Sequence, residues 1–387
     1  MREYLFVPVP RRCRKSCEID AHRCIGMFDT ILPADTVEFC PHPAAQDIFV
    51  CGTYNLIQTE ETVRTSPQKR NGQCLVFKCH YDDNDIGQSS FDKIQEIDYP
   101  ALPDMKWCHR SAASKATLCV ADSEGEIHLL DWNLEESRLE ETTRKQIAGS
   151  SETLCLSLDW SNRRTLTSDP GKLVVSCSDG DLVLLDPTPS SLVTLEKWTA
   201  HDYEPWIAAW NYWDTNTVYS GGDDFKLKGW DIRTDLHQPI FVNKRFEAGI
   251  TTIQSHPYIE HLFAVGSYDS SVRLFDIRKP IIPLCETNVG GGAWRVKWHP
   301  SAIRKSDLLV ACMHDGFKTL RFDELREEKT HLEELSPSKS ASVVHQFDEH
   351  QSLAYGVDWS FAPPSSDGRT AIASCSFYDH SLHFWSG

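Results

Sequence analysis

Apolar residues recur along this chain in short runs that are separated by turn-forming Gly, Asp, Asn and Pro. The stretch 201–233 shows the unit. It holds the apolar run WIAAW, a second run TVYSG, the tight turn GDD and a third run that ends in WDIR. Three short strands separated by turn residues explain this pattern better than a helix does.

The three-strand unit repeats along the chain. Seven units can be counted from their first strands, which read TVEFCPHP, DMKWCH, CLSLDWS, IAAWNYW, TTIQSHP, WRVKWHP and AYGVDWS. The turn acids follow one another at intervals of 45, 45 and 46 residues in the series Asp179, Asp224, Asp269 and Asp315. Such a period, with a Trp-Asp pair, is typical of WD40 propeller blades. The sequence therefore predicts an all-β, seven-bladed WD40 β-propeller over residues 25–387, with a charged, Ser-rich insertion at about 324–342.

The two ends of the chain predict how the ring closes. The last unit stops at Trp385 in its third strand, and the apolar segment CIGMFDTIL near 24–32 belongs to no other unit. Pairing the two completes the last blade and protects its edge. We therefore expect an N-terminal strand to close the last blade, and residues 1–24 to form a disordered arm. The spacing in that arm matches no standard zinc finger, so no metal site is expected from Cys13, Cys17, His22 and Cys24.

Composition narrows the class of partner. The net charge of −17 argues against nucleic acid and anionic membranes as direct partners. No apolar run reaches the roughly 18 residues that a membrane-spanning helix needs. Several Cys lie inside apolar runs, as reduced, buried thiols do in a cytoplasmic protein. These are Cys119, Cys155, Cys177, Cys312 and Cys375.

Two groups of polar residues fit the structural set of a WD40 blade, in which a His, the turn Asp and a third-strand Trp bond to one another. The first group is His201, Asp224 and Trp230, and the second is His350, Asp379 and Trp385. A buried Asp and an indole N–H both need hydrogen-bond partners. We therefore predict that these residues hold blades together and take no part in chemistry.

A different set of positions is predicted to surround one mouth of the central channel. The residue before each turn acid faces that mouth, and the loops into the first strands add two tryptophans. The set includes Trp206, Asp223, Tyr268, Trp294, His314 and Tyr378. In propellers such a face usually binds protein. The sequence contains none of the strings GxSxG, HExxH, GxxxxGK or GxGxxG, so the residues alone lead to an interaction protein.

Several stretches carry a closer resemblance. They include CGTYNL (51–56), GGGAWRVKWHP (290–300), ACMHDGFK (311–318) and CSFYDHSLHFW (375–385). Together these stretches resemble the diphthine methylesterase family, WD-repeat proteins of diphthamide biosynthesis that are also catalogued as diphthine methyltransferases. The resemblance implies hydrolysis of the methyl ester of methylated diphthine on elongation factor 2, giving diphthine and methanol without a cofactor. Elongation factor 2 is then the substrate protein, and other enzymes of the pathway are candidate partners.

The mouth residues suit that implied chemistry. The substrate carries a trimethylammonium group, which favours aromatic faces by roughly 0.5–2 kcal/mol each. A site of Trp206, Tyr268, Trp294 and Tyr378 is therefore expected to bind it, with Asp223 adding negative charge. His314 is the first candidate for the base that activates water, and His380 is the second. Cys312 is an alternative nucleophile, although a buried structural thiol is the favoured interpretation of it.

A non-catalytic role remains open. Because the chain lacks a standard catalytic string, it also fits a WD40 scaffold that presents elongation factor 2 to other enzymes or recruits a ubiquitin ligase. The sequence does not distinguish an enzyme nucleophile from an activated water.

Overall fold

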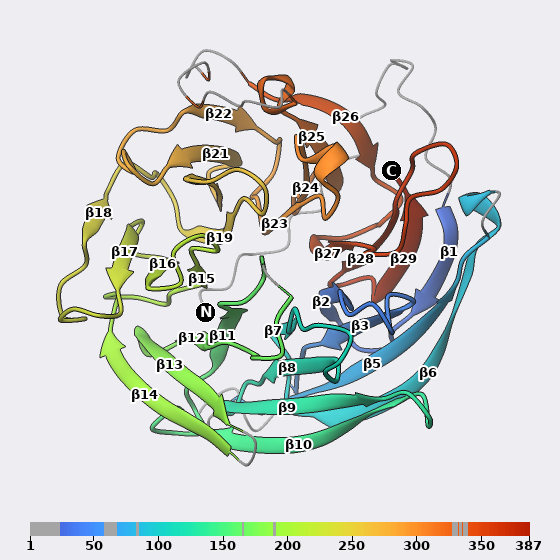
Figure 1. Cartoon of the computed structure of the whole chain (residues 1–387), viewed down its shortest axis with the longest axis horizontal. Helices are drawn as coiled ribbons and strands as arrows, with labels where there is room; N and C mark the ends of the chain where they lie inside the picture. The colour runs from blue at the N-terminus through green and yellow to red at the C-terminus, as the bar shows by residue number, and fades with distance from the viewer. Residues whose placement is uncertain are drawn as a thin grey trace.

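The computed structural model describes residues 24–57, 68–82, 85–164, 166–188, 191–326, 332, 335 and 340–387. In this part of the chain, seven antiparallel sheets are arranged in a ring around a central axis (Figure 1). The predicted all-β, seven-bladed propeller is confirmed. The division into an arm of residues 1–24 and one propeller of residues 25–387 stays a prediction. Residues 1–23, including Cys13, Cys17 and His22, and most of the insertion lie outside the described residues.

Each blade begins with its innermost strand and proceeds outwards (Figure 1). The first blade holds β2 (Ala34–Phe39), β3 (Ile48–Thr53), β5 (Arg70–His80) and β6 (Ser90–Tyr99), with β4 (Asn55–Leu56) paired to β5. The second holds β7 (Asp104–Trp107), β8 (Thr117–Ala121), β9 (Glu126–Asn133) and β10 (Arg138–Gln146). The third holds β11 (Cys155–Trp160), β12 (Leu173–Cys177), β13 (Asp181–Thr188) and β14 (Ser191–Thr199).

The remaining blades follow the same order. The fourth holds β15 (Ile207–Trp210), β16 (Thr217–Gly221), β17 (Leu227–Asp231) and β18 (Phe241–Asn243). The fifth holds β19 (Ile250–Ser255), β20 (Leu262–Ser267), β21 (Ser271–Asp276) and β22 (Cys285–Asn288). The sixth holds β23 (Arg295–Trp298), β24 (Asp307–Ala311), β25 (Phe317–Arg321) and β26 (Ser342–Phe347). The seventh holds β27 (Ala354–Trp359), β28 (Ala371–Ser376), β29 (Ser381–Ser386) and β1 (Cys24–Asp29).

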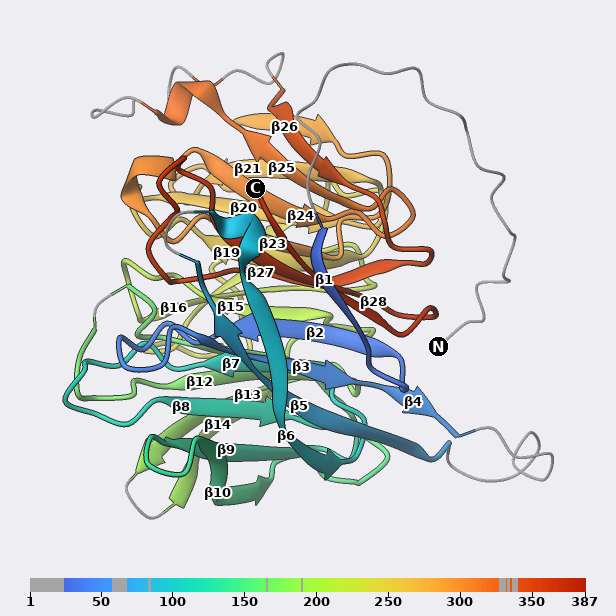
Figure 2. The same ribbon diagram turned by 90° about the vertical axis from the view of Figure 1, so that its right-hand side faces the viewer.

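The ring closes as the sequence predicts. Strand β1 pairs antiparallel with β29, from Cys24 opposite Trp385 to Asp29 opposite Ser381. It also touches β6 of the first blade, so the first and last parts of the chain share one wall of the ring (Figure 2). The described residues include three short helical turns, at Ile86–Gln88, Ala302–Arg304 and Asp323–Leu325. No described helix is long and apolar enough to cross a membrane.

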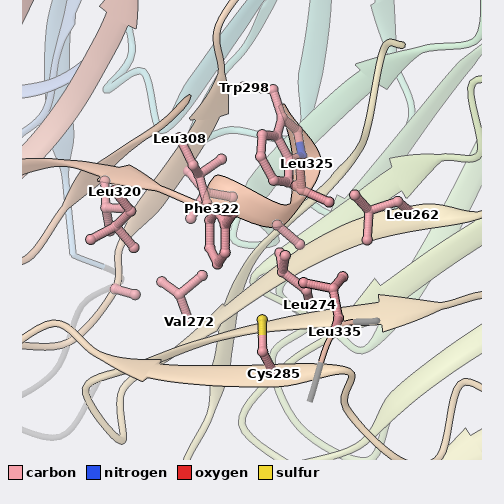
Figure 3. Close-up of a cluster of buried hydrophobic side chains, with 14 of the residues drawn as sticks. Leu262, Val272, Leu274, Cys285, Trp298, Leu308, Leu320, Phe322, Leu325 and Leu335 are labelled. Atoms are coloured by element: carbon pink, nitrogen blue, oxygen red, sulfur yellow. The ribbon is translucent and has the colours of Figure 1, made fainter. Parts of the chain in front are cut away.

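The core lies between the blades. Figure 3 shows one interface, where Leu262 and Leu274 of the fifth blade pack against Trp298 and Leu308 of the sixth. The five Cys residues predicted to be buried are buried. Because apolar side chains fill the gaps between sheets, the inner edges of the ring are left for polar groups.

The aromatic residues at the ends of the inner strands join neighbouring blades. A tryptophan indole donates a hydrogen bond to a backbone carbonyl of the preceding blade's inner strand at five of the seven junctions, and Ser255 does so through its hydroxyl at a sixth. The pairs are Trp107 with Glu38, Trp160 with Lys106, Trp210 with Asp159, Ser255 with Trp210, Trp298 with Gln254, and Trp359 with Lys297. This explains the repeated aromatic at the end of each unit's first strand.

Candidate functional site

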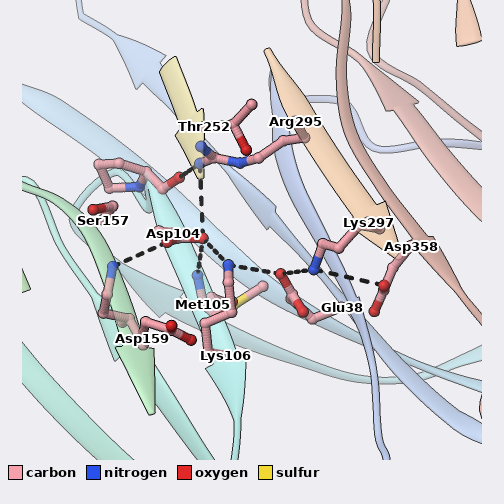
Figure 4. A network of polar contacts seen from close by, with 12 residues as sticks. Glu38, Asp104, Met105, Lys106, Ser157, Asp159, Thr252, Arg295, Lys297 and Asp358 are labelled. Carbon is pink, nitrogen blue, oxygen red and sulfur yellow. Dashed lines mark hydrogen bonds and ion pairs between the residues drawn. The ribbon is translucent and has the colours of Figure 1, made fainter. Parts of the chain in front are cut away.

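The central channel is filled by charged side chains. Glu38 lies 2.7 Å from the ammonium of Lys106 and 2.6 Å from that of Lys297 (Figure 4). Burial opposes ionisation of this carboxyl, but the two ammonium groups outweigh it and lower the pKa of Glu38 to about 2. Next to this network, the space lined by Asp104, Lys106 and Arg295 measures only about 30 Å³, roughly enough for one water molecule. This space therefore does not admit a ligand larger than water.

Aromatic rings gather at one mouth of the channel. Trp294 contacts Trp206 at 5.8 Å between ring centroids, Tyr268 at 5.9 Å and Tyr355 at 4.8 Å. Tyr355 continues to Phe377 at 5.0 Å, and Phe377 to Tyr378 at 4.9 Å. We call Trp206, Tyr268, Trp294, Tyr355, Phe377 and Tyr378 the aromatic face. All four aromatic residues predicted from the sequence belong to this one cluster.

The blade geometry explains why residues so distant in sequence meet here. Trp206 and Trp294 directly precede the inner strands β15 and β23, whereas Tyr268 directly follows the second strand β20. The start of an inner strand is antiparallel to the end of the second strand, as the pairs Ile207–Gly221 and Arg295–Ala311 show. Both positions therefore open onto the same end of the channel.

Two glycines allow Tyr268 to take its place in the face. A Cβ at Gly249 would lie 3.2 Å from Tyr268 Cδ2 and 2.3 Å from Asp223 Oδ1. A Cβ at Gly292 would lie 3.3 Å from Tyr268 Cδ1 and 2.7 Å from the sulfur of Met313. The phenol ring is thus flanked by two positions that leave no room for a larger residue. Gly292 is part of the GGGAW stretch that carried the family resemblance.

A carboxyl stands behind each of the two indoles. Burial raises the pKa of Asp223, and the indole of Trp206 partly opposes this. Burial likewise raises the pKa of Asp35 to about 7; Arg295 and the Trp294 indole lower it, and Asp104 raises it. Neither indole nitrogen reaches hydrogen-bond geometry with a described residue, and neither does Asp35 Oδ1. The site therefore holds a carboxyl that changes charge near neutral pH.

Asp35 and Tyr355 were not predicted from the sequence. Each lies on a β-bulge, where the pairing of β2 with β3 shifts between Ala34 and Thr36, and that of β27 with β28 between Ala354 and Val357. A bulge breaks the alternation of side chains and redirects the extra residue. The sequence rule for mouth positions covered only the residue before each turn acid and the loops into the first strands, so it did not include Asp35 or Tyr355. The bulge in β27 includes Gly356, a residue type that often marks a bulge within a strand, whereas no glycine lies beside Asp35.

The two predicted histidine bases lie outside the aromatic cluster. His314 is exposed on the turn between β24 and β25, next to Met313, which reaches towards Tyr268. His380 has a left-handed backbone with φ of 54°, and its carbonyl accepts hydrogen bonds from the amide and hydroxyl of Thr30 at 2.9 and 3.0 Å. His314 thus stands at the rim of the face, whereas the His380 backbone is tied to the end of the closing strand.

Cys312 is a buried thiol. Its side chain is fully buried, and burial raises its pKa to about 12. A thiol that stays protonated and covered is a poor nucleophile. The structure therefore agrees with a structural role for this residue.

The two predicted blade sets differ in detail. His201 Nδ1 lies 2.8 Å from Asp224 Oδ1, its Nε2 lies 2.7 Å from the Ser220 hydroxyl, and that hydroxyl accepts from the Trp230 indole at 2.8 Å. The second set is not linked directly in this way. His350 contacts the hydroxyls of Ser381 and Ser374 at 2.7 and 2.9 Å, and Trp385 donates to Ser374 at 3.0 Å.

In this second set Asp379 accepts from the backbone amides of Gln351 and Ser381. The direct bond between Asp379 and His350 that the pattern suggested is therefore replaced by one to Ser381. The seventh blade is held by serine hydroxyls and backbone amides where the fourth uses a His–Asp pair.

Two groups of described residues bring metal-ligating atoms within 4.8 Å of one another: Cys24 with Glu349 and His383, and Asp122 with Glu126 and His128. The first lies at the seam of β1 and β29. In the second, the two nitrogens of His128 already lie 3.0 Å from Asp122 and from Glu141. Neither group includes a residue of the aromatic face. The expectation that the reaction needs no metal stays a prediction.

No family model matches the chain. It is 39% identical over 347 residues to the diphthine methyltransferase of Homo sapiens, covering 86% of this chain and 74% of that protein. It is 36% identical over 377 residues to a diphthine methyltransferase homolog of Dictyostelium discoideum, covering 91% and 96%. A chain in the crystal structure of a mitotic checkpoint complex superposes with a TM-score of 0.63 at 15% identity, over 100% of this chain and 98% of that one.

Fold, repeat and closure define a WD-repeat β-propeller with an aromatic face at one mouth of its channel. The structural neighbour adds the fold alone, because its sequence identity is low. The relatives also establish the family, since their sequence similarity extends over most of both chains. The chain belongs to the diphthine methyltransferase family, which implicates it in diphthamide biosynthesis.

Proposed function

We propose that this protein hydrolyses the methyl ester of methylated diphthine on elongation factor 2. Water adds to the ester carbonyl, the bond from carbonyl carbon to methoxy oxygen breaks, and the products are the carboxyl group of diphthine and methanol. The main support for this proposal is the aromatic face, in which the Trp206 and Trp294 indoles each lie beside a carboxyl, that of Asp223 and that of Asp35. Aromatic rings and nearby negative charge are the groups that a trimethylammonium ion favours.

The residues have distinct proposed roles. Trp206, Tyr268 and Tyr378 offer ring surface to the trimethylammonium group, supported from below by Trp294. Asp223, partly exposed beside Trp206, adds negative charge. His314 at the rim is the proposed base that takes a proton from the attacking water, and His380 is the alternative.

The whole chain suits a protein substrate. A mouth on the surface, above a channel that is filled by ion pairs, admits a side chain presented by another protein. The net charge of −17 favours encounter with a basic surface. We accordingly propose elongation factor 2 as the partner and the cytoplasm as the location. Other enzymes of the pathway are further candidates.

The names of the relatives favour a second candidate, methyl transfer onto diphthine. Intact-mass analysis of elongation factor 2 separates the two. Incubation of the methylated substrate with the purified protein and water alone is expected to remove the mass of one methylene unit. A gain of that mass, only with S-adenosylmethionine and unmethylated substrate, would establish methyl transfer. If the mass of elongation factor 2 changes under neither condition, the protein is a non-catalytic scaffold.

The base is tested with paired variants. His314→Ala is expected to lower the rate of ester hydrolysis by roughly 100-fold or more, since a positioned base contributes about that much. His380→Ala serves as the matched control on the neighbouring blade and is expected to keep its activity. If His380→Ala loses activity and His314→Ala keeps it, His380 is the base. Full turnover by both variants would remove histidine from the mechanism.

A further inference from the structure

Asp35 is a buried carboxyl whose Oδ1 makes no hydrogen bond to the described residues. The residue is 6% exposed and lies on the bulge between Ala34 and Thr36, at the start of the inner strand β2. Buried polar atoms are nearly always bonded, so an exception needs a reason. The other carboxyls of the inner strands have partners; Asp358, for example, accepts from the Phe39 amide at 2.9 Å and lies 3.5 Å from Lys297.

The groups that face Asp35 come from four blades. Arg295 and Trp294 belong to the sixth blade, Asp104 to the second, Tyr355 and Cys375 to the seventh, and Tyr54 to the first. Arg295 is the one cation among these described groups, and its guanidinium lies 3.7 Å from Asp104. Asp104 also lies 2.5 Å from Lys106, which Glu38 shares at 2.7 Å, so the nearby cations are divided among other carboxylates and an ionised Asp35 competes with Asp104 for Arg295.

Two members of the aromatic face, Trp294 and Tyr355, interact with this carboxyl. The Trp294 ring is stacked on Tyr355 with an interplanar angle of 22°, and the N–H edge of its indole faces Asp35. The outer rings Trp206, Tyr268 and Tyr378 are accessible, and Tyr378 is 54% exposed. A cation resting on these rings would be close to Asp35 through a medium of low dielectric constant, where charges interact strongly.

We propose that the aromatic face binds a quaternary ammonium ion and that Asp35 is its buried counter-charge, releasing its proton when the cation binds. The empty site then avoids a buried, unpaired carboxylate by holding a proton, and the ligand itself supplies the charge that makes ionisation favourable. This inference identifies how the face recognises the trimethylammonium group of the proposed substrate. It rests on the proposed function only for the identity of the natural ligand.

The direction of the pH effect follows from linkage. Because the pKa of Asp35 is about 7 in the empty protein, about half of the molecules carry the proton at neutral pH. A bound cation favours the carboxylate and lowers this pKa, so affinity must rise as the pH increases and fall as it decreases. A decrease of one unit corresponds to about a tenfold difference in affinity between the acidic and alkaline limits.

Choline is a suitable probe, because its uncharged carbon analogue dimethylbutanol has nearly the same shape. Binding to the full chain is followed by the NMR shifts of the indole N–H groups between about pH 5.5 and 8.5. Choline is expected to bind about tenfold more tightly at the alkaline end, and dimethylbutanol to show no dependence on pH. Absence of choline binding at every pH, or an equal pH dependence for both compounds, would overturn the inference.

Proton release tests the wild-type protein without any substitution. At about pH 7, choline is expected to release roughly 0.4 of a proton per bound cation, as a one-unit decrease of the pKa requires. The release is measured with an indicator dye in weakly buffered solution. Binding without release would show that Asp35 is not coupled to the cation.

Matched variants assign the effect to one carboxyl. Asp35→Asn keeps the shape, and its affinity for choline is expected to equal that of the wild type at low pH and to be independent of pH around 7. Asp223→Asn is expected to weaken binding but to keep the step near pH 7. A step that persists in Asp35→Asn would overturn the assignment.

The inference and the proposed function can fail separately. Choline binding with the expected pH step, but no ester hydrolysis, would leave a quaternary-ammonium site in a protein of different activity. Ester hydrolysis by a protein that releases no proton with choline would keep the proposed function and remove the role of Asp35.

Discussion

Asp35 and Glu38 lie three positions apart on the same inner strand, both are buried, and their charge states differ. The pKa of Glu38 is lowered to about 2, whereas that of Asp35 is raised to about 7. Burial opposes ionisation in both cases. Two lysine ammonium groups within 2.7 Å outweigh it at Glu38, while Arg295 near Asp35 is shared with Asp104.

The comparison separates two uses of the channel. In its centre the charges are paired with one another, which fixes the inner strands and closes the passage. At the mouth, next to the aromatic face, Asp35 has a pKa of about 7 and no dedicated cation. A buried carboxylate that lacks a dedicated cation costs stability, and sites where such a cost persists are often functional.

The largest expected effect on stability comes from removing the charge of Glu38, the carboxylate paired with two lysines. Glu38→Gln leaves Lys106 and Lys297 without their shared carboxylate and should reduce the free energy of unfolding by about 3–5 kcal/mol. Since the pKa of Glu38 is lowered in the folded state, its contribution is present at neutral pH. It disappears as the pH falls from the unfolded value towards 2. Urea unfolding at neutral pH measures the change.

A surface acid provides the control for this prediction. Glu96 pairs with Lys93 at 2.5 Å on the partly exposed strand β6. Glu96→Gln should change the stability by less than about 1 kcal/mol. Equal effects at Glu38 and Glu96 would contradict the role given to the channel network.

Asp35→Asn should act in the opposite direction. Because the pKa of Asp35 is raised in the folded protein, this acid is least costly below its unfolded value. Its cost grows as the pH rises through about 7. The variant should therefore be more stable than the wild type by about 3–4 kcal/mol near pH 8 and nearly equal to it near pH 4. Unfolding curves at both pH values give the difference, and a difference independent of pH would contradict the raised pKa.

The smallest expected effect on stability comes from substituting Trp294, the indole beside Asp35. Trp294→Phe removes an indole N–H that lowers the pKa of Asp35, so that pKa should rise further. The lost ring area should cost about 1–2 kcal/mol of stability. The more exposed Trp206 offers the comparison, and Trp206→Phe should cost less. A smaller cost at Trp294 than at Trp206 would show that the buried ring does not support the face.

Much of the site could be predicted because the place of a residue within its blade determines the end of the channel at which it lies. Trp206, Tyr268, Trp294 and Tyr378 were assigned to one mouth from their places beside the first and second strands, and their rings lie in one cluster. Asp35 and Tyr355 were not predicted, because they lie within the first strands β2 and β27 and the sequence rule covered only the turns and the preceding loops. The repeat also suggested a His–Asp bond in the seventh blade, where the structure has His350 bonded to Ser381.

The sequence by itself determined the number of blades, their order and the closure by the N-terminal strand. Those features follow from the period of turn residues and apolar runs, which is local information. The tertiary structure alone decided which buried acids are paired. Glu38 meets Lys297 across 259 positions of sequence, whereas the cation near Asp35, Arg295, is shared with Asp104. Charge state depends on neighbours in space, and the ring brings those neighbours from separate blades.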